Sequence, residues 1–376
     1  MRPYVDPITW MPFHVDLSKL PNTCWLDLGE FVAGIRALDH AALGLVDGRP
    51  FVRALNAQAI LARFAMDGLV IPITVIEQTL AEGAKRAGTV PFGKELEAFL
   101  SASDHLPDTP ASNTTLDARY LADLHAMVGG PGDGAGTMRW RSTTMEGKPW
   151  EGVPHEVITP FVEDLMDWLN SADLAAPDPE LDAPYRVIRC LLAELYLAWI
   201  RPFSMGHHRV LAIFDEAILR GSPNLTRTGL FLSIALYRSG PQYAEELGSA
   251  ARSSDPLPFL TFCIRGMLDE LRSVQRRIGH LQQHGLWRAQ LLDLFQEGND
   301  APTRRQRQIL LDLAGASGPV PLNRVGSLSP SLAALYAGVS EKTLRRDMDA
   351  LVQAGLVQRG PNGLRIDLNT LLVFSR

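Results

Sequence analysis

Apolar residues recur along most of this chain at intervals of three and four, the spacing that lines one face of an α-helix. In residues 184–200, Val187, Leu191 and Leu195 follow this period. The same pattern predicts further helices over residues 26–43, 50–66, 75–87, 116–128, 155–169, 207–220, 227–238, 241–252 and 257–297. Most of the chain is therefore expected to be helical.

Strand-like segments are sparse. The best candidates are Met138–Thr144, with the residues after it, and Leu356–Asp367. We therefore expect an all-α body and a C-terminal domain in which helices accompany a small β-hairpin. Polar stretches containing Pro and Gly mark the loops between helices. The predicted division is an N-terminal helical segment (1–115), a core (116–256), a connecting helix (257–302) and a C-terminal domain (303–376).

Within the connecting helix, residues 271–295 alternate basic and apolar side chains. Two interpretations fit this pattern. The segment is either a dimerisation or spacer helix, or a helix that packs on the body and leaves a basic face in solvent.

The composition is that of a globular protein, with 46% hydrophobic residues and a mean hydropathy of zero. No apolar run approaches the roughly 18 residues that cross a bilayer, so we expect no membrane association. The start of the chain lacks the apolar stretch of a signal peptide. The three cysteines are far apart and form no CxxC pair, so neither a disulfide framework nor a zinc site is expected. These features favour the cytoplasm.

The net charge of −6 is unevenly distributed. From Thr303 to the end, ten Lys or Arg residues stand against five Asp or Glu, whereas the first 302 residues carry 26 against 37. A basic domain on an acidic body is typical of proteins in which only one part contacts phosphate.

The segment from Pro330 to Asp367 has the pattern of a helix-turn-helix. Gly338 supplies the turn residue that tolerates a positive φ, and Ser340 is placed to cap the second helix. Leu344 and Met348 are spaced to bury one face of that helix. A tight turn follows, Arg359–Arg365, which has the form of a wing.

The opposite face of the second helix carries basic and polar residues that reach base edges when such a helix enters the major groove. The segment resembles the winged helices of bacterial transcription regulators. This resemblance implies double-stranded DNA as partner and, because one small domain reads few bases, a homodimer. The alternative is a winged helix that binds protein. The predicted DNA contacts are Arg304, Arg305, Arg307, Ser340, Lys342, Thr343, Arg345, Arg346, Arg359 and Arg365.

In the body, Ile200–Arg209 (IRPFSMGHHR) resembles the motif of the Fic family, His-Pro-Phe-x-Asp/Glu-Gly-Asn-Gly-Arg-x-x-Arg. Three segments before the motif support the resemblance. Leu124–His125 is similar to the family's Leu-His helix, Gly136–Arg139 to the Gly-x-x-Arg start of its target-docking flap, and His155–Asn170 to the helix that often ends in Trp-Leu-Asn. The resemblance implies a Fic-like helical fold. In active members the motif transfers AMP from ATP to a protein hydroxyl.

The motif departs from the family at its chemical positions. Arg201 replaces the His that accepts a proton, and a guanidinium is not a base near neutrality. Met205 replaces the acid that holds Mg²⁺, although Mg²⁺ requires oxygen ligands. His207 and His208 replace Asn and Gly, and side chains about 100° apart on a helix do not chelate one metal comfortably. We therefore expect no catalytic residue, no metal and no cofactor here, and either surface or ligand-contacting histidines.

What remains of the motif leaves alternatives open. In one interpretation the motif forms an anion site at a helix start, made of Arg201, Gly206, His207, His208 and Arg209. In the other, Arg201 pairs with Glu194 or Asp215. Asp67, with Arg63 four residues before it, is the nearest match to the family's inhibitory Ser-x-x-x-Glu-Gly segment.

The leading hypothesis is a DNA-binding transcription regulator whose Fic-like body is inactive and binds a partner protein or nucleotide ligand. The alternatives are a Fic-type enzyme with a non-standard motif and an interaction scaffold.

Overall fold

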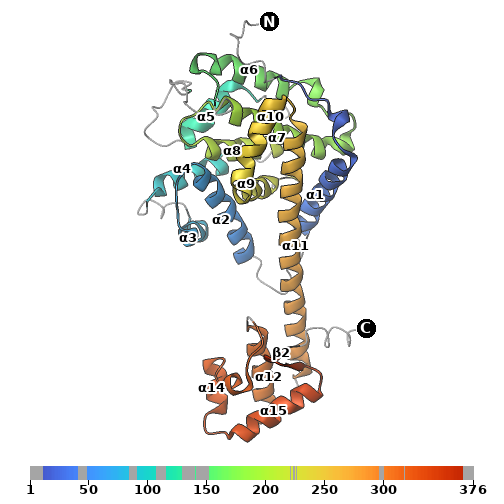
Figure 1. Ribbon diagram of the computed structural model, residues 1–376. Helices are drawn as coiled ribbons and strands as arrows, with labels where there is room; N and C mark the ends of the chain where they lie inside the picture. Colours follow the sequence, from blue (N-terminus) through green and yellow to red (C-terminus); the bar gives the residue numbers. More distant parts are fainter. Residues whose placement is uncertain are drawn as a thin grey trace. The chain divides into compact units, whose positions relative to one another are not determined.

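The computed structural model in Figure 1 describes most of the chain. The described residues are 12–40, 49–83, 91–106, 116–128, 140, 152–220, 222, 225, 227–295, 300–316 and 318–366. The predicted docking flap Gly136–Arg139 and, apart from residue 140, the predicted strand Met138–Thr144 lie outside them. The chain forms two compact units, which we call the body (Met1–Ala41 and Arg49–Val274) and the tail (Ala42–Gly48 and Gln275–Arg376).

The body is helical, as predicted. Its helices are α1 (Asn22–His40), α2 (Arg49–Met66), α3 (Ile73–Glu82), α4 (Gly93–Asp104), α5 (Ala118–Val128), α6 (Ile158–Leu169), α7 (Asp182–Ile200), α8 (His207–Leu219), α9 (Thr228–Ser239), α10 (Pro241–Ser253) and α11 (Leu257–Leu294), and the boundary with the tail falls within α11. Short 3-10 turns lie at Leu17–Lys19, His155–Val157, Ala172–Leu174 and Pro179–Leu181. Helix α4 lies outside the predicted helices, because its last residues belong to the polar, Pro-containing stretch Ser101–Thr115, whose composition favours a loop. Among the helices that the structure describes, none combines the length and the hydropathy needed to cross a membrane.

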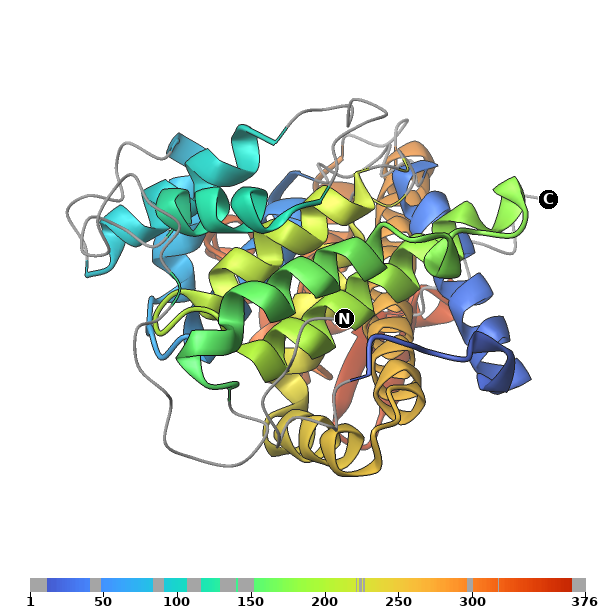
Figure 2. The same ribbon diagram turned by 90° about the horizontal axis from the view of Figure 1, so that it is seen from above.

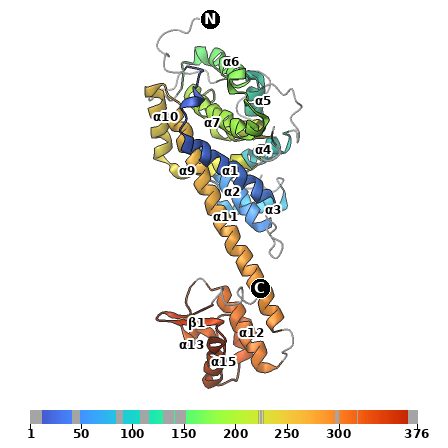
Figure 3. The ribbon, with the colours of Figure 1, turned by 90° about the vertical axis from the view of Figure 1, so that its right-hand side faces the viewer.

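Helix α7 lies at the centre of the body. Every residue from Cys190 to Ile200 is buried, and a helix that is buried all round must be enclosed by other elements. Helices α1, α6, α8 and α10 pack against it, and the views in Figures 2 and 3 show this enclosure. Because Arg201 directly follows α7, this core fixes the start of the motif.

Helix α2 packs on α9, α3 and α8. Gly68, with φ +79°, follows its last turn, and the Leu69 N–H returns to the carbonyl of Phe64. A left-handed residue that ends a helix in this way satisfies carbonyls that otherwise have no partner. This turn places Asp67 against the start of α8.

The tail contains α12 (Ala301–Ala314), α13 (Leu322–Val325), α14 (Pro330–Tyr336), α15 (Glu341–Gln353) and the strands β1 (Val357–Gly360) and β2 (Gly363–Ile366). The strands form the predicted antiparallel hairpin, with Val357 opposite Ile366. Val320 adds a bridge to Leu364 on the other side of β2. The core of the tail includes Trp287 and Leu291 from α11.

Candidate nucleic-acid interface and anion site

The turn between α14 and α15 has the predicted geometry. Gly338 takes φ +76°, and Ser340, at the N-cap position of α15, is extended. The predicted capping bond is absent, however. The hydroxyl of Ser340 lies 3.1 Å from Oγ1 of Thr343, and its side chain accepts no backbone N–H.

Helix α15 is strongly amphipathic. Leu344, Met348 and Leu351 are buried against the tail core. The other face lines a hollow of about 480 Å³. Its lining residues are Ser340, Lys342, Thr343, Arg345, Arg346, Asp349, Ala350 and Gln353. Five predicted DNA contacts are thus brought together on one exposed helix face.

The hairpin carries the two remaining arginines of the predicted wing, and both are exposed. Arg359 donates to Oδ1 of Asp349 at 2.9 Å, which ties the wing to α15. Arg365 donates to Oε1 of Gln358 on the opposite strand at 2.9 and 3.1 Å. Exposed pairs of this kind exchange readily for phosphate, because they are worth little in water.

Helix α12 corrects one prediction. Arg304 is exposed and Arg307 is partly exposed, but Arg305 is only 7% exposed. Its Nε donates to Oδ2 of Asp347 at 2.7 Å, and the same oxygen accepts the hydroxyl of Tyr336 at 2.8 Å. Arg305 is therefore a buried contact between α12 and α15 and, contrary to the prediction, is not on the exposed face of the tail. The sequence contained a sign of this, since Arg305 lies one turn before the buried Ile309.

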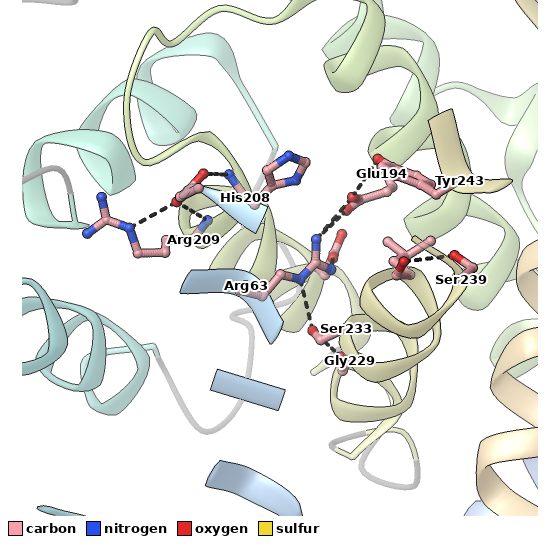
Figure 4. A network of polar contacts seen from close by, with 11 residues as sticks. Arg63, Glu194, His208, Arg209, Gly229, Ser233, Ser239 and Tyr243 are labelled. Carbon is pink, nitrogen blue, oxygen red and sulfur yellow. Dashed lines mark hydrogen bonds and ion pairs between the residues drawn. The ribbon is translucent and has the colours of Figure 1, made fainter. Parts of the chain in front are cut away.

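The motif in the body joins α7 to α8. Figure 4 shows two of its residues, His208 and Arg209. Arg201 takes the left-handed conformation at φ 45°, and its N–H closes α7 on the carbonyl of Leu197 at 2.7 Å. Gly206, at φ +68°, stands at the N-cap of α8. The surviving glycine thus provides the positive φ that starts the helix.

The start of α8 binds an anion that belongs to the chain itself. The carboxylate of Asp67 accepts the N–H of His208 at 2.8 Å and the N–H of Arg209 at 3.2 Å. Nε of Arg209 donates to the same carboxylate at 2.9 Å. A helix N-terminus favours negative charge, and here Asp67 occupies the place where an external anion would bind.

Neither histidine is fully exposed: His207 is buried and His208 is half-buried. His207 is 3% exposed, and among the described residues neither of its ring nitrogens has a hydrogen-bond partner. Burial, followed by the charges of His208 and Arg201, lowers the pKa of His207 well below 6.5. Burial lowers the pKa of His208 to about 3. Both rings are therefore neutral at physiological pH. The described residues contain no group of three or more side chains suited to hold a metal.

Glu194 and Asp215, which one of the two interpretations paired with Arg201, both pair with Arg63. Figure 4 shows the contact with Glu194. Arg63 donates to Glu194 at 3.0 Å, to Asp215 at 2.7 Å and to the Ser233 hydroxyl at 2.9 Å. Burial and the neighbouring Glu194 raise the pKa of Asp215 well above its usual value, although Arg63 opposes this. Two buried carboxylates thus share one buried guanidinium.

Comparison with known proteins supports the assignment of the tail. Residues 321–370 match the DeoR-like helix-turn-helix domain. No curated protein sequence matches the chain. Among solved structures, the chain is similar to a Fic family protein from Desulfovibrio desulfuricans G20, with 16% identity, 91% of this chain and 96% of that chain covered, and a TM-score of 0.48. At this distance the similarity carries no information on individual residues. The tail thus contains a helix-turn-helix domain of the DeoR-like type.

Proposed function

We propose that the chain is a transcription regulator that reads double-stranded DNA with α15, and that its Fic-like body transfers no nucleotide. The observation that carries the DNA proposal is the exposed face of α15. Its first two turns gather Lys342, Thr343, Arg345 and Arg346 at the end of the helix that reaches base edges in the major groove.

The wing complements this face. Arg359 and Arg365 are placed to bind phosphate while α15 contacts bases. Arg304 and Arg307 add positive charge at the start of α12. We further propose that two copies of the chain bind together, because a single small domain reads few base pairs. Light scattering of the full chain, with and without DNA, measures that stoichiometry.

The DNA proposal is tested with the full chain on a random-sequence duplex pool. Selection identifies a preferred duplex, and fluorescence anisotropy then measures its affinity. We expect the double variant R345A/R346A to bind about tenfold more weakly or worse. The matched control is R36A/R119A, which removes two exposed arginines from helices α1 and α5 of the body. Equal affinity for the wild type and R345A/R346A would contradict the assignment of α15.

The proposed inactivity of the body rests on three residues. Arg201 stands where Fic enzymes have a base, Met205 stands where they have a metal ligand, and Asp67 fills the phosphate position. The test is incubation with labelled ATP and cell lysate. We expect no label transfer; transfer that Arg209→Ala abolishes would establish the alternative, a Fic-type enzyme with a non-standard motif.

The place of the body is then that of a binding module. Gly206 and Arg209 shape an anion site at the start of α8, and the carboxylate of Asp67 occupies that site. A carboxylate of a partner protein or a phosphate is an anion of the same kind and could bind there in place of Asp67. The three cysteines are free and buried, which suits the reducing cytoplasm that we propose as the compartment.

A further inference from the structure

A cavity of about 430 Å³ lies inside the body, among helices α2, α3, α4, α8 and α9. Its volume falls within the range of sites that enclose small molecules, about 300–1,000 Å³. The residues that line it include none of Arg201, Gly206, His207, His208 and Arg209. The cavity is therefore separate from the anion site at the start of α8, although Ala212, which stands at the last position of the family's motif, lies in its wall.

Much of the wall is apolar. Val52 and Ile60 contribute from α2, Leu80 from α3, Phe99 from α4 and Leu230 from α9. Side chains from four helices thus surround a space that suits a ring or a short alkyl chain.

Both arginines in the lining already have partners. Arg63 donates to Ser233, Glu194 and Asp215, as Figure 4 shows for the first two. Arg227 has a contact of its own. An acceptor group on a ligand would therefore compete with existing bonds of these arginines.

Acceptors in the lining are more available. Within the described residues, the side-chain amide of Asn56, which accepts as well as donates, forms no hydrogen bond, and Asp104 is exposed and its carboxylate can only accept. Glu216 accepts from Ser103 and Arg220, one bond on each oxygen, and each carboxylate oxygen has two lone pairs. The polar end of the cavity thus favours a ligand that donates.

We propose that this cavity binds a small amphipathic molecule with an apolar ring or short alkyl body and an amine or carboxamide as its polar end. The apolar walls take the body, and Asn56, Asp104 and Glu216 accept the N–H groups. A ligand with a carboxylate in place of the amine is repelled by the like charges of Asp104 and Glu216. This site does not depend on the proposed DNA binding.

The test uses three probes with one body, namely 3-phenylpropylamine, 3-phenylpropanamide and 3-phenylpropionate. Isothermal titration and thermal denaturation of the full chain measure their binding. We expect the amine and the amide to bind and to raise the melting temperature, and the carboxylate to bind about tenfold more weakly or not at all. Failure of both donor probes, or equal binding of the carboxylate, would overturn the proposal.

Three variants locate the site. Ala212→Phe fills the cavity from α8 and should weaken the amine about tenfold. Asp104→Asn should weaken the amine more than the amide, whereas Glu245→Gln, an exposed acid on α10, should change neither. Asp67→Asn alters the motif and should leave affinity within about twofold. A loss of binding in Asp67→Asn together with full binding in Ala212→Phe would place the probe at the motif and overturn the proposal.

Discussion

Asp67 and Arg209, which are 142 residues apart in the chain, form a buried ion pair with 2.9 Å between Oδ2 and Nε. Both side chains are at most 4% exposed. Asp67 thereby serves as the counter-ion of a helix N-terminus that would otherwise attract an external anion.

Asp67→Ala should destabilise the body by about 3–5 kcal/mol, because Arg209 stays buried without its partner. Inorganic phosphate at constant ionic strength should restore part of that stability by occupying the vacated site. Urea unfolding with and without phosphate measures both effects. The wild type and Glu245→Ala serve as controls. If phosphate stabilises all three proteins equally, α8 holds no anion site.

The sequence predicted most of the fold because periodicity reports burial directly. The central helix α7 and the amphipathic α15 were both identified from apolar residues at intervals of three and four. Helix α4 was missed, since Leu96 and Phe99 begin a short stripe that ends in the polar residues after Ser101. Local pattern favoured a loop there, and packing on α5 and α8 decided for a helix.

The site was predicted less completely, for a physical reason. Spacing along one helix shows which face is buried but not which distant residue it meets. The sequence offers Glu194 and Asp215 only as partners of Arg201, which is near them in the chain, whereas Arg63, with which they pair, lies more than a hundred residues away on α2. Arg305 was assigned to DNA on charge alone, because its partner Asp347 comes from another helix.

Stability of the body should fall in mild acid because His208 is neutral in the folded state. Its pKa is lowered to about 3, whereas an unfolded chain takes up the proton below about pH 6.5. The stabilisation is thus present above pH 6.5 and is lost as the pH falls toward 3. For His208 alone the loss reaches up to about 2 kcal/mol at pH 5.

Urea unfolding at pH 7 and pH 5 measures this difference. His208→Asn should show a smaller drop than the wild type, and His280→Asn, which changes an exposed histidine, should show the same drop as the wild type. An unchanged drop in His208→Asn would mean that other groups carry the acid sensitivity.

Two neighbouring arginines of α12 should behave in opposite ways. Arg305→Ala leaves Asp347 buried without its cation and should destabilise the tail by about 3–5 kcal/mol. Arg304→Ala should alter stability by less than about 0.5 kcal/mol, because the side chain is exposed.

DNA binding should separate the pair again. Arg304→Ala should lower affinity for all sequences and reduce the salt slope by about one unit, as expected of a phosphate contact. Folded Arg305→Ala should keep the wild-type slope. Denaturation curves and anisotropy at several salt concentrations provide both readouts. A stable Arg305→Ala protein with a reduced slope would return Arg305 to the DNA-facing set.

Gly363 should not tolerate a side chain. It begins β2 at φ +130°, and a Cβ there would lie 2.6 Å from the carbonyl carbon and oxygen of Val320. Backbone in that region costs about 1–3 kcal/mol for other residues, and the clash with Val320 adds to the cost. Val320 also forms the bridge to Leu364, the next residue of β2. A shift of β2 away from Val320 would therefore break the bridge that attaches the wing to the tail core. Gly363→Ala should therefore lower both the urea midpoint of the tail and the affinity for DNA.

Gly318→Ala is the matched control, because a Cβ at that position meets nothing within 4 Å. Superimposable unfolding curves for the two variants would show that the wing does not depend on this close approach.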